Sequence, residues 1–256
     1  MAGRSALVTG VSRPEGIAWA VTRRLRDDGW ALQLTGWPRH DDEQPWGGAD
    51  RPPDQALERD GVPWSPADLA DPDVPARLVE QHVQRHGSLD ALVAVHARSS
   101  DQSLATVTAA ELDASFAVNT RATLLLVQAA ARVGVRRVVL FTTGVHRDPM
   151  PDEIPYAVSK AALQGITASL AAALAPSGAT VNCLNPGPVD TGWADPGTHA
   201  FVADRMPLAP RWGRQDDIAG VVAWLLSDDA GWVTGQTLDA DGGWGIRSGV
   251  APRAGM

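Results

Sequence analysis

The sequence predicts an α/β fold: a single doubly wound domain with a seven-stranded parallel sheet and helices on both faces. Three observations predict it. Short apolar runs alternate along the 256 residues with longer segments of helical periodicity, as in parallel sheets with right-handed crossovers. The first apolar run, 5–9, leads directly into a glycine-containing turn and a helix. Hydrophobic residues make up 44% of the chain, which is enough for one large core.

The strands are expected where short apolar segments occur, as in buried parallel strands. These segments are 5–9, 31–35, 61–64, 90–95, 136–141, 179–184 and 236–239. The helices are expected at 16–28, 72–86, 108–133, 153–175 and 215–227. Thr108 and Glu111 form a capping box at the start of the third of these helices.

The remaining segments define the domain limits. Residues 36–53 are rich in Pro, Gly, Asp and Trp, and we interpret them as a long loop that a short helix follows. The chain has no internal repeat, so we expect one domain over 1–246. Residues 247–256 lack a periodic pattern and are expected to form a mobile C-terminal tail.

Composition narrows the class of protein. The net charge of -8 argues against nucleic acid or an anionic membrane as the main partner. A single cysteine, Cys183, excludes an internal disulfide. The first strand begins at Ser5, which leaves no room for a signal peptide, and we expect no segment that crosses a bilayer. The sequence therefore predicts a cytoplasmic enzyme.

Tyr156 and Lys160 are the most informative pair of residues. They lie four positions apart in the predicted helix 153–175, so they are neighbours on one helix face. A cation beside a phenol favours the phenolate and lowers the tyrosine pKa from about 10. A tyrosine tuned in this way is a candidate general acid or base. Taken alone, the spacing is equally consistent with an exposed pair without a catalytic role.

The turn after the first strand is a candidate phosphate site. Gly10 and Gly16-Ile17-Ala18 stand between a strand and a helix, which is the context in which a dinucleotide pyrophosphate binds a helix N-terminus. Glycine allows the backbone to approach phosphates closely. The spacing differs from G-x-G-x-x-G, so an ordinary strand-to-helix turn is the alternative for this motif alone.

Together these segments resemble the short-chain dehydrogenase/reductase family, which has a Rossmann-type fold, over nearly the whole chain. The family's Y-x-x-x-K is Tyr156 and Lys160, and its T-G-x3-G-x-G is matched from Thr9, with two extra residues and alanine for the last glycine. The family's catalytic serine corresponds to Thr143 and its helix asparagine to Asn119. Further matches lie at 181–191, 211–218, 224–228, 233–236 and 241–243.

The resemblance implies a reaction and a role for each residue. Tyr156 is the general acid or base that protonates the carbonyl oxygen while hydride arrives from a nicotinamide. Lys160 lowers the pKa of Tyr156 and binds the nicotinamide ribose. Thr143 donates a hydrogen bond to the substrate oxygen, and Asn119 anchors a water in a proton relay. The substrate is a small carbonyl compound or a secondary alcohol.

The resemblance also implies the cofactor contacts, and no metal. The expected cofactor-binding residues are Gly10, Ser12, Arg13, Gly16, Ile17, Trp37, Arg39, Asp68, Leu69, Val95, His96, Tyr156, Lys160, Pro186, Gly187, Val189 and Thr191. NAD enzymes place a carboxylate at the end of the second strand. Here that strand ends at Trp37 without one, Asp41 and Asp42 come several positions later, and Arg13 and Arg39 are available for a 2′-phosphate. We therefore expect NADP(H) to be preferred over NAD(H).

One departure from the family pattern concerns the stretch after the fourth strand. The family's N-N-A-G aligns with 94–97, so two side-chain amides are missing. His96 and Arg98 then become candidates to face the cofactor or substrate, and His146 is a candidate for the mouth of the site, although an exposed loop histidine is the simpler interpretation.

Two other functions remain as alternatives. The first is a 3-oxoacyl-thioester reductase that serves an acyl carrier protein, for which Arg121, Arg136 and Arg137 are the available basic residues. The second is a nucleotide-binding sensor or a redox-inactive scaffold. In the family, two helices form a dimer face within a homotetramer. Small residues on the matching helices predict a homo-oligomer, either a dimer or a tetramer: Ala122, Ala129, Ala130, Ala161, Ala168 and Ala172.

Overall fold

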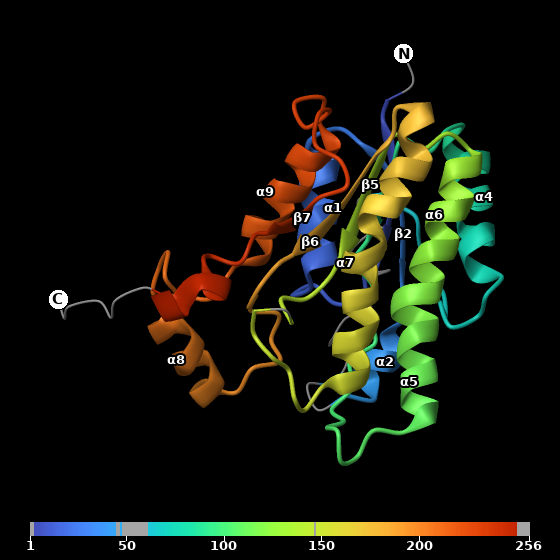
Figure 1. The fold of residues 1–256 in the computed structure, drawn as a ribbon. Coiled ribbons are helices and arrows are strands. Elements are labelled where there is room, and N and C mark those ends of the chain that lie inside the picture. Colours follow the sequence, from blue (N-terminus) through green and yellow to red (C-terminus); the bar gives the residue numbers. More distant parts are fainter. Residues whose placement is uncertain (1–2, 45–46, 48–60, 146, 250–256) are drawn as a thin grey trace.

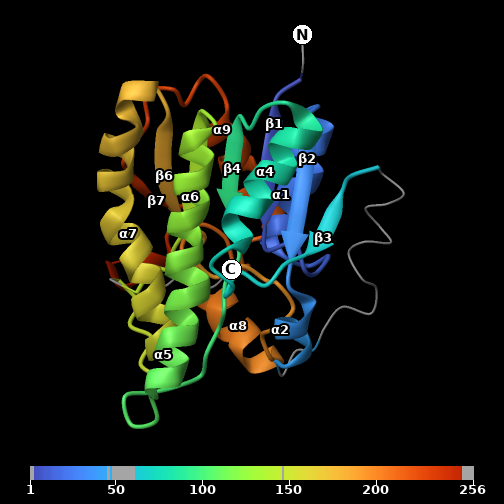
Figure 2. The same ribbon diagram turned by 90° about the vertical axis from the view of Figure 1, so that its right-hand side faces the viewer.

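The sheet of this protein carries seven parallel strands in the part of the chain that the structure describes (Figures 1 and 2). The structure is a computed structural model, and it describes residues 3–44, 47, 61–145 and 147–249. The strand order is β3-β2-β1-β4-β5-β6-β7. The bounds are Ser5–Thr9 (β1), Ala31–Gly36 (β2), Trp64–Pro66 (β3), Ala91–Ala94 (β4), Arg137–Phe141 (β5), Thr180–Asn185 (β6) and Thr237–Asp239 (β7). The predicted doubly wound sheet is thus confirmed.

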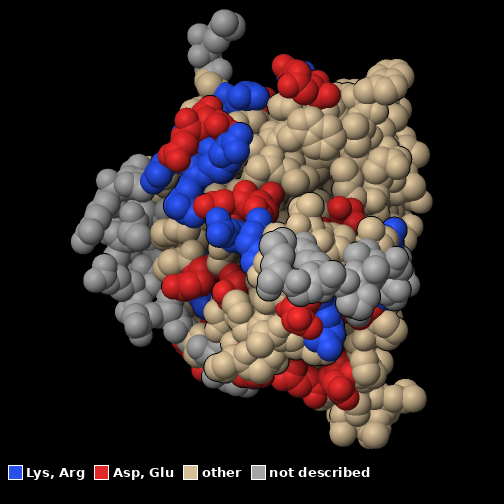
Figure 3. Space-filling model, turned by 90° about the vertical axis from the view of Figure 1, so that its left-hand side faces the viewer, with Lys and Arg blue, Asp and Glu red and all other residues tan. Residues whose placement is uncertain are grey.

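Helices cover both faces of the sheet. On one face α1 (Ile17–Asp27) packs against α9 (Gln215–Leu226), and on the other lie α4 (Val74–His86), α6 (Ala122–Arg132) and α7 (Ile154–Leu174) (Figure 2). Successive residues of β1 alternate between the two layers, because side chains of a strand point to opposite faces. Val8 belongs to the core under α1 and α9, whereas Leu7 belongs to the core under α4, α6 and α7. Lys and Arg are interspersed with Asp and Glu on the side that includes α9 (Figure 3).

Three of the predicted elements differ from the observed ones. The expected long helix 108–133 is α5 (Ala109–Ser115), a π-helical segment η1 (Phe116–Arg121) and α6. The predicted loop 36–53 contains a short helix, α2 (Pro38–Asp42), and α8 (Pro196–Arg205) was not expected at all. A 3-10 helix, η3 (Trp244–Gly249), continues past the expected domain limit at residue 246, and residues 250–256 of the expected tail lie outside the described residues.

The predicted capping box at α5 is only half formed. The Thr108 hydroxyl accepts from the Glu111 backbone N–H at 3.2 Å, as expected. The Thr108 N–H, however, donates to Gln102 at 3.0 Å instead of to Glu111. The Glu111 carboxylate is engaged by Arg98, a charged donor that binds a carboxylate more strongly than a neutral N–H does.

The expectation that no segment is apolar enough for a membrane span was wrong by length and composition. Ile154–Ser177, which is α7 with its 3-10 extension η2 (Ala175–Ser177), has a mean hydropathy of 1.3 over the test window. Such a value is weak evidence, since core helices pass the same test. Here α7 packs on β5 and β6, and its Leu163 and Thr167 are buried.

Candidate active site

A cavity of about 880 Å³ opens at the carboxyl ends of the strands, around the point between β1 and β4 where the strand order reverses. Ligands of open parallel sheets bind at this position. Every residue expected to contact the cofactor lines the cavity, as do Thr143, Tyr156 and Lys160. Asn119 does not line it and is fully buried behind the wall. His146 lies outside the described residues.

The glycine turn and the start of α1 form an anion site in this cavity. Gly16 is the N-cap of α1 and supplies no side-chain cap, so the helix N-terminus borders the cavity through Gly16, Ile17 and Ala18. Uncapped N–H groups and the helix dipole favour a phosphate there. Gly10 has a φ of 82°, and a Cβ on it would lie 2.6 Å from the His96 backbone nitrogen. The residues present therefore fit a dinucleotide pyrophosphate.

The adenosine end of the cavity differs from what the sequence suggested. Arg13 does border the cavity, but its Nε lies 3.3 Å from Asp41 Oδ1, and each side chain is only 15% exposed. Sequence position placed Asp41 too far along the chain, but the turn of α2 directs it back toward the glycine turn. Arg39 is 76% exposed and pairs with Glu43 at 3.2 Å. A carboxylate thus stands beside the cation that was expected to bind a 2′-phosphate.

Lys160 is buried at the centre of the cavity wall. Its Nζ donates to the carbonyl oxygens of His96 (3.1 Å) and Phe141 (3.3 Å), which lie at the ends of two neighbouring strands. Burial lowers the pKa of Lys160 to about 8. The Thr142 hydroxyl donates to the Lys160 carbonyl at 2.9 Å and so fixes α7 against the end of β5.

Tyr156 does not show the lowered pKa that the pairing with Lys160 predicted. Burial raises the pKa of Tyr156, and the nearby Glu153 carboxylate raises it further. Desolvation of the phenolate is thus the main cause, and both causes act against the lowered pKa. Thr143 lines the same cavity, and its hydroxyl lies 3.4 Å from the Met150 sulfur.

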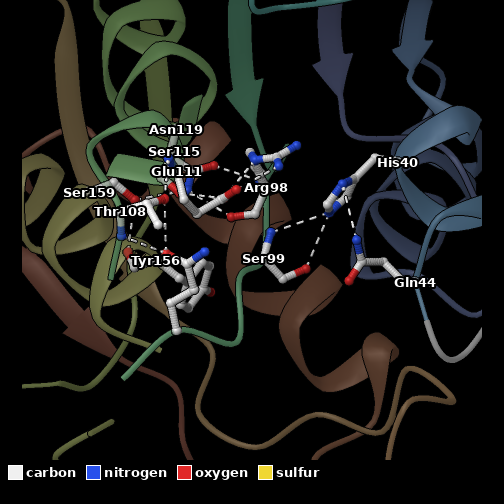
Figure 4. Close-up of polar contacts among 11 residues, drawn as sticks. His40, Gln44, Arg98, Ser99, Thr108, Glu111, Ser115, Asn119, Tyr156 and Ser159 are labelled. Carbon is white, nitrogen blue, oxygen red and sulfur yellow. Dashed lines mark hydrogen bonds and ion pairs between the residues drawn. The ribbon is translucent and has the colours of Figure 1, made fainter. Parts of the chain in front are cut away.

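Asn119 acts from behind the wall (Figure 4). Its amide nitrogen donates to Ser159 Oγ (2.8 Å) and to the Arg98 carbonyl (3.0 Å), and its amide oxygen accepts from the Arg98 N–H (2.7 Å). Ser159 in turn donates to the Tyr156 carbonyl at 2.8 Å. The amide thus links η1 to α7 and to the segment after β4. A π-helical turn at this position is typical of a functional site.

His96 is a wall residue whose ring is fully engaged within the protein. Its Nε2 must carry the proton, since it lies 3.1 Å from the Val118 carbonyl oxygen, and Nδ1 then accepts from the Thr9 hydroxyl at 2.6 Å. Burial, with Lys160 nearby, lowers the pKa of His96 to about 3. The ring is therefore neutral and connects β1 to η1. The sequence had suggested instead that His96 faces the cofactor or the substrate.

A second polar link was not foreseen (Figure 4). Arg98 forms two 2.8 Å contacts with Glu111, so its guanidinium is held by α5. The next residue, Ser99, donates from its backbone N–H to His40 Nε2 at 3.3 Å. His40 belongs to α2, so this bond joins the segments after β2 and β4. Only the three-dimensional fold brings these residues together, because α2 was interpreted as loop.

Comparisons with known proteins agree with this geometry. A family model described as enoyl-(acyl carrier protein) reductase matches residues 10–245. The chain is 32% identical over 233 residues to the uncharacterized oxidoreductase YjdA of Bacillus subtilis, covering 88% of this chain and 90% of the relative. It is 31% identical over 242 residues to human dehydrogenase/reductase SDR family member 4, covering 90% and 83% of the two chains.

Solved structures give the same result. A short-chain dehydrogenase/reductase from Serratia marcescens has a TM-score of 0.81 at 31% identity and covers 95% of this chain and 98% of its own. A blue fluorescent protein from a metagenomic library, in complex with NADPH, has a TM-score of 0.79 at 31% identity, with 94% and 98% covered. The chain belongs to the short-chain dehydrogenase/reductase family and is an NAD(P)-dependent oxidoreductase of a small-molecule substrate.

Proposed function

We propose that this member of the short-chain dehydrogenase/reductase family is an NADP(H)-dependent enzyme that interconverts a carbonyl compound and its secondary alcohol, with Tyr156 as general acid and base. One observation carries the proposal. Tyr156, Lys160 and Thr143 line the same cavity as the uncapped N-terminus of α1. A hydrogen-bond donor, a proton donor and an anion site are thereby combined in one cavity.

The side chains divide the work as follows. A bound nicotinamide supplies the hydride. The raised pKa keeps Tyr156 protonated at neutral pH, so its hydroxyl is ready to give a proton to the carbonyl oxygen during reduction. The Thr143 hydroxyl donates to the same oxygen as negative charge develops on it. Lys160, whose ammonium is held by two carbonyl oxygens in the same cavity wall, would bind the nicotinamide ribose.

The preference for NADP(H) rests on Arg13. No carboxylate stands at Trp37, where β2 ends, and the Arg13 guanidinium borders the cavity. A guanidinium binds phosphate through paired charge-assisted hydrogen bonds. The NADPH complex of the blue fluorescent protein supports the proposal by analogy. Asp41 opposes it, because its carboxylate competes for Arg13.

The test is oxidation of NADPH in the presence of a panel of carbonyl compounds. Tyr156→Phe should reduce turnover to below about a tenth while NADPH still binds, because it removes the proton donor and little else. Trp232→Phe is the control, since Trp232 is fully exposed and does not line the cavity. Higher residual activity in Tyr156→Phe would assign the proton to another group.

The carrier-protein reductase is the less favoured alternative. Arg136 and Arg137 come at the amino end of β5, whereas the cavity lies at the carboxyl ends, and Arg137 is buried and pairs with Asp228. On the face in Figure 3 basic and acidic side chains alternate, without the broad basic patch that an acidic carrier needs. A sensor or scaffold is also disfavoured, since pure binding requires no Tyr–Lys pair in the cavity wall.

We also propose that the protein forms a homo-oligomer, but through a different contact surface from the one that the sequence suggested. Of the small residues expected on the suggested surface, Ala122, Ala129 and Ala130 are buried within the chain, whereas Ala161 is half-buried and Ala168 and Ala172 of α7 are exposed. Phe116 of η1 and Val158 of α7 are 37% and 42% exposed, and η1 packs on α7. We place the contact there. Cytoplasmic location stays a prediction.

A further inference from the structure

Aromatic side chains form one wall of the cavity. Trp193, Phe201, Trp212 and Trp244 all line it. Trp193 meets Trp212 edge to face with ring centroids 5.6 Å apart, and Phe201 meets Trp244 in the same way at 6.5 Å. Trp212 and Trp244 are buried, whereas Trp193 and Phe201 are 49% and 51% exposed. The wall therefore has a buried aromatic base and two half-exposed rings, of which Phe201 has one face covered by the Arg205 guanidinium at 3.9 Å from the ring centroid.

This wall is connected to the reacting end of the cavity. The Trp244 indole N–H donates to Asp148 Oδ2 at 2.6 Å. The Asp148 backbone N–H donates to the Gly144 carbonyl at 3.0 Å, and Gly144 follows Thr143 in the chain. The aromatic wall and the proposed oxygen-binding hydroxyl are thus held by one loop.

The other side of the wall is fixed as well. His199 of α8 stacks on Trp212 at 5.1 Å, and its Nε2 lies 3.0 Å from Asp190 Oδ2. The Trp212 indole N–H donates to the His199 carbonyl at 2.8 Å. Asp190 lies between the cofactor-facing Val189 and Thr191, so the wall is anchored beside the cofactor site. A ring surface that is fixed in advance binds a planar group with little loss of entropy.

The cavity lining carries more negative than positive charge: seven carboxylates face five cations, which are four arginines and Lys160. Each of the four arginines that line it is paired with a carboxylate: Arg13 with Asp41, Arg39 with Glu43, Arg98 with Glu111 and Arg147 with Asp239. Among the described residues, the lining carboxylates of Glu153 and Asp101 have no hydrogen bond or ion pair, whereas those of Asp68 and Asp241 accept from backbone N–H groups. Glu153 also interacts with Tyr156. An anionic substrate group close to Glu153 and Asp101 would therefore be repelled, while the Lys160 ammonium is already engaged by two backbone carbonyl oxygens.

We propose that the substrate is a carbonyl compound that carries an aryl ring and no anionic group, with the ring against Trp193 and Phe201. This rests on the proposed function, because it presumes that the carbonyl is placed at Tyr156 and Thr143. The aromatic wall supplies attraction for the ring, and the unpaired carboxylates exclude anions.

Kinetics with three ketones and NADPH at pH 8 test the proposal. We expect kcat/KM for acetophenone to exceed that for 2-butanone and that for 4-acetylbenzoate by about tenfold each. Trp193→Leu and Phe201→Leu should raise KM for acetophenone several-fold and leave KM for 2-butanone nearly unchanged. Trp232→Leu, outside the cavity, is the matched control. Glu153→Gln should raise the ratio of 4-acetylbenzoate to acetophenone turnover.

A binding measurement separates this inference from the proposed function. Calorimetric titration with 1-phenylethanol and 1-cyclohexylethanol should show tighter binding of the aryl alcohol, and Trp193→Leu should remove the difference. If no ketone oxidises NADPH, the proposed function fails while this titration still tests the wall. Equal binding of the two alcohols would overturn the assignment of an aryl ring to the substrate. Equal turnover of acetophenone and 4-acetylbenzoate would overturn the exclusion of anionic groups.

Discussion

Asp41→Asn should increase the preference for NADPH over NADH by about tenfold. The substitution removes one charge and keeps the size and shape of the side chain. Asp41 lies 3.3 Å from the Arg13 guanidinium, and both side chains are 15% exposed. A 2′-phosphate that binds Arg13 must compete with this carboxylate, whereas the 2′-hydroxyl of NADH carries no charge and is much less affected.

The magnitude follows from the geometry of the pair. At 3.3 Å and an effective dielectric of about 20, the direct attraction is about 5 kcal/mol. Desolvation of the two groups offsets most of that attraction. The pair therefore keeps a net stabilisation of about 1.4 kcal/mol. Arg13 loses this stabilisation when it binds a 2′-phosphate instead, which corresponds to about a tenfold change in the affinity for NADPH.

The assay compares dissociation constants of NADPH and NADH for four variants. Arg13→Ala should lower the preference, and in the double variant Asp41→Asn should no longer change it, since the two residues act through one contact. Asp42→Asn is the control, because Asp42 is exposed and does not line the cavity. An unchanged ratio in Asp41→Asn, or an equal change in Asp42→Asn, would refute the reasoning.

Three further predictions concern the site, the core and the assembly. Thr143→Ala should cost roughly 2–4 kcal/mol of transition-state stabilisation in kcat/KM, whereas Thr143→Ser should be nearly neutral because it keeps the hydroxyl; a serine variant as slow as alanine would mean that geometry, not the hydroxyl, matters. The folded-state pKa values of His82 and His96 are lowered to about 4 and about 3, mainly by burial, so the stability that these neutral rings contribute is present above pH 6.5 and is lost as pH falls toward 4. Denaturant unfolding at pH 5 should therefore show a loss of about 2 kcal/mol for each ring relative to pH 7, and a pH-independent stability would contradict it. Light scattering should give a mass that is a multiple of 27.0 kDa, with Val158→Lys shifting it toward the monomer; a monomeric wild type would exclude the proposed assembly.

The sequence predicted the sheet well because its signals are local. Apolar runs and their spacing are contained in a few residues, and all seven strands were expected within a few positions of their observed bounds. The short helix α2 was missed because five residues starting at Pro38 give no helical periodicity. That omission had a consequence for the site: Asp41 was judged too distant in sequence, while α2 turns it toward Arg13.

For the site residues too, local patterns predicted which side chains come together, but not the properties that depend on the fold. Motif spacing selected the side chains that line the cavity, since the carboxyl ends of parallel strands converge. Their ionisation could not be predicted from spacing. A Tyr–Lys pair suggests a lowered pKa for Tyr156, but the result depends on burial and on Glu153, and both raise it. The sequence places Trp193, Trp212 and Trp244 in loops, where each could cover a pocket or cap the core, and only the fold brings them together in one wall.

The N-N-A-G motif of the family is missing here, and a different side chain supports this part of the cavity wall. Ala94 and Val95 cannot brace the sheet through their side chains, but the His96 ring takes over this work by joining Thr9 of β1 to the Val118 carbonyl of η1. The same residue's carbonyl oxygen accepts from Lys160. Bracing and positioning of the ammonium therefore depend on one residue, and its ring stays neutral because burial disfavours the charged form. A buried histidine with both ring nitrogens bonded links β1 to η1 and, through its carbonyl oxygen, also holds Lys160.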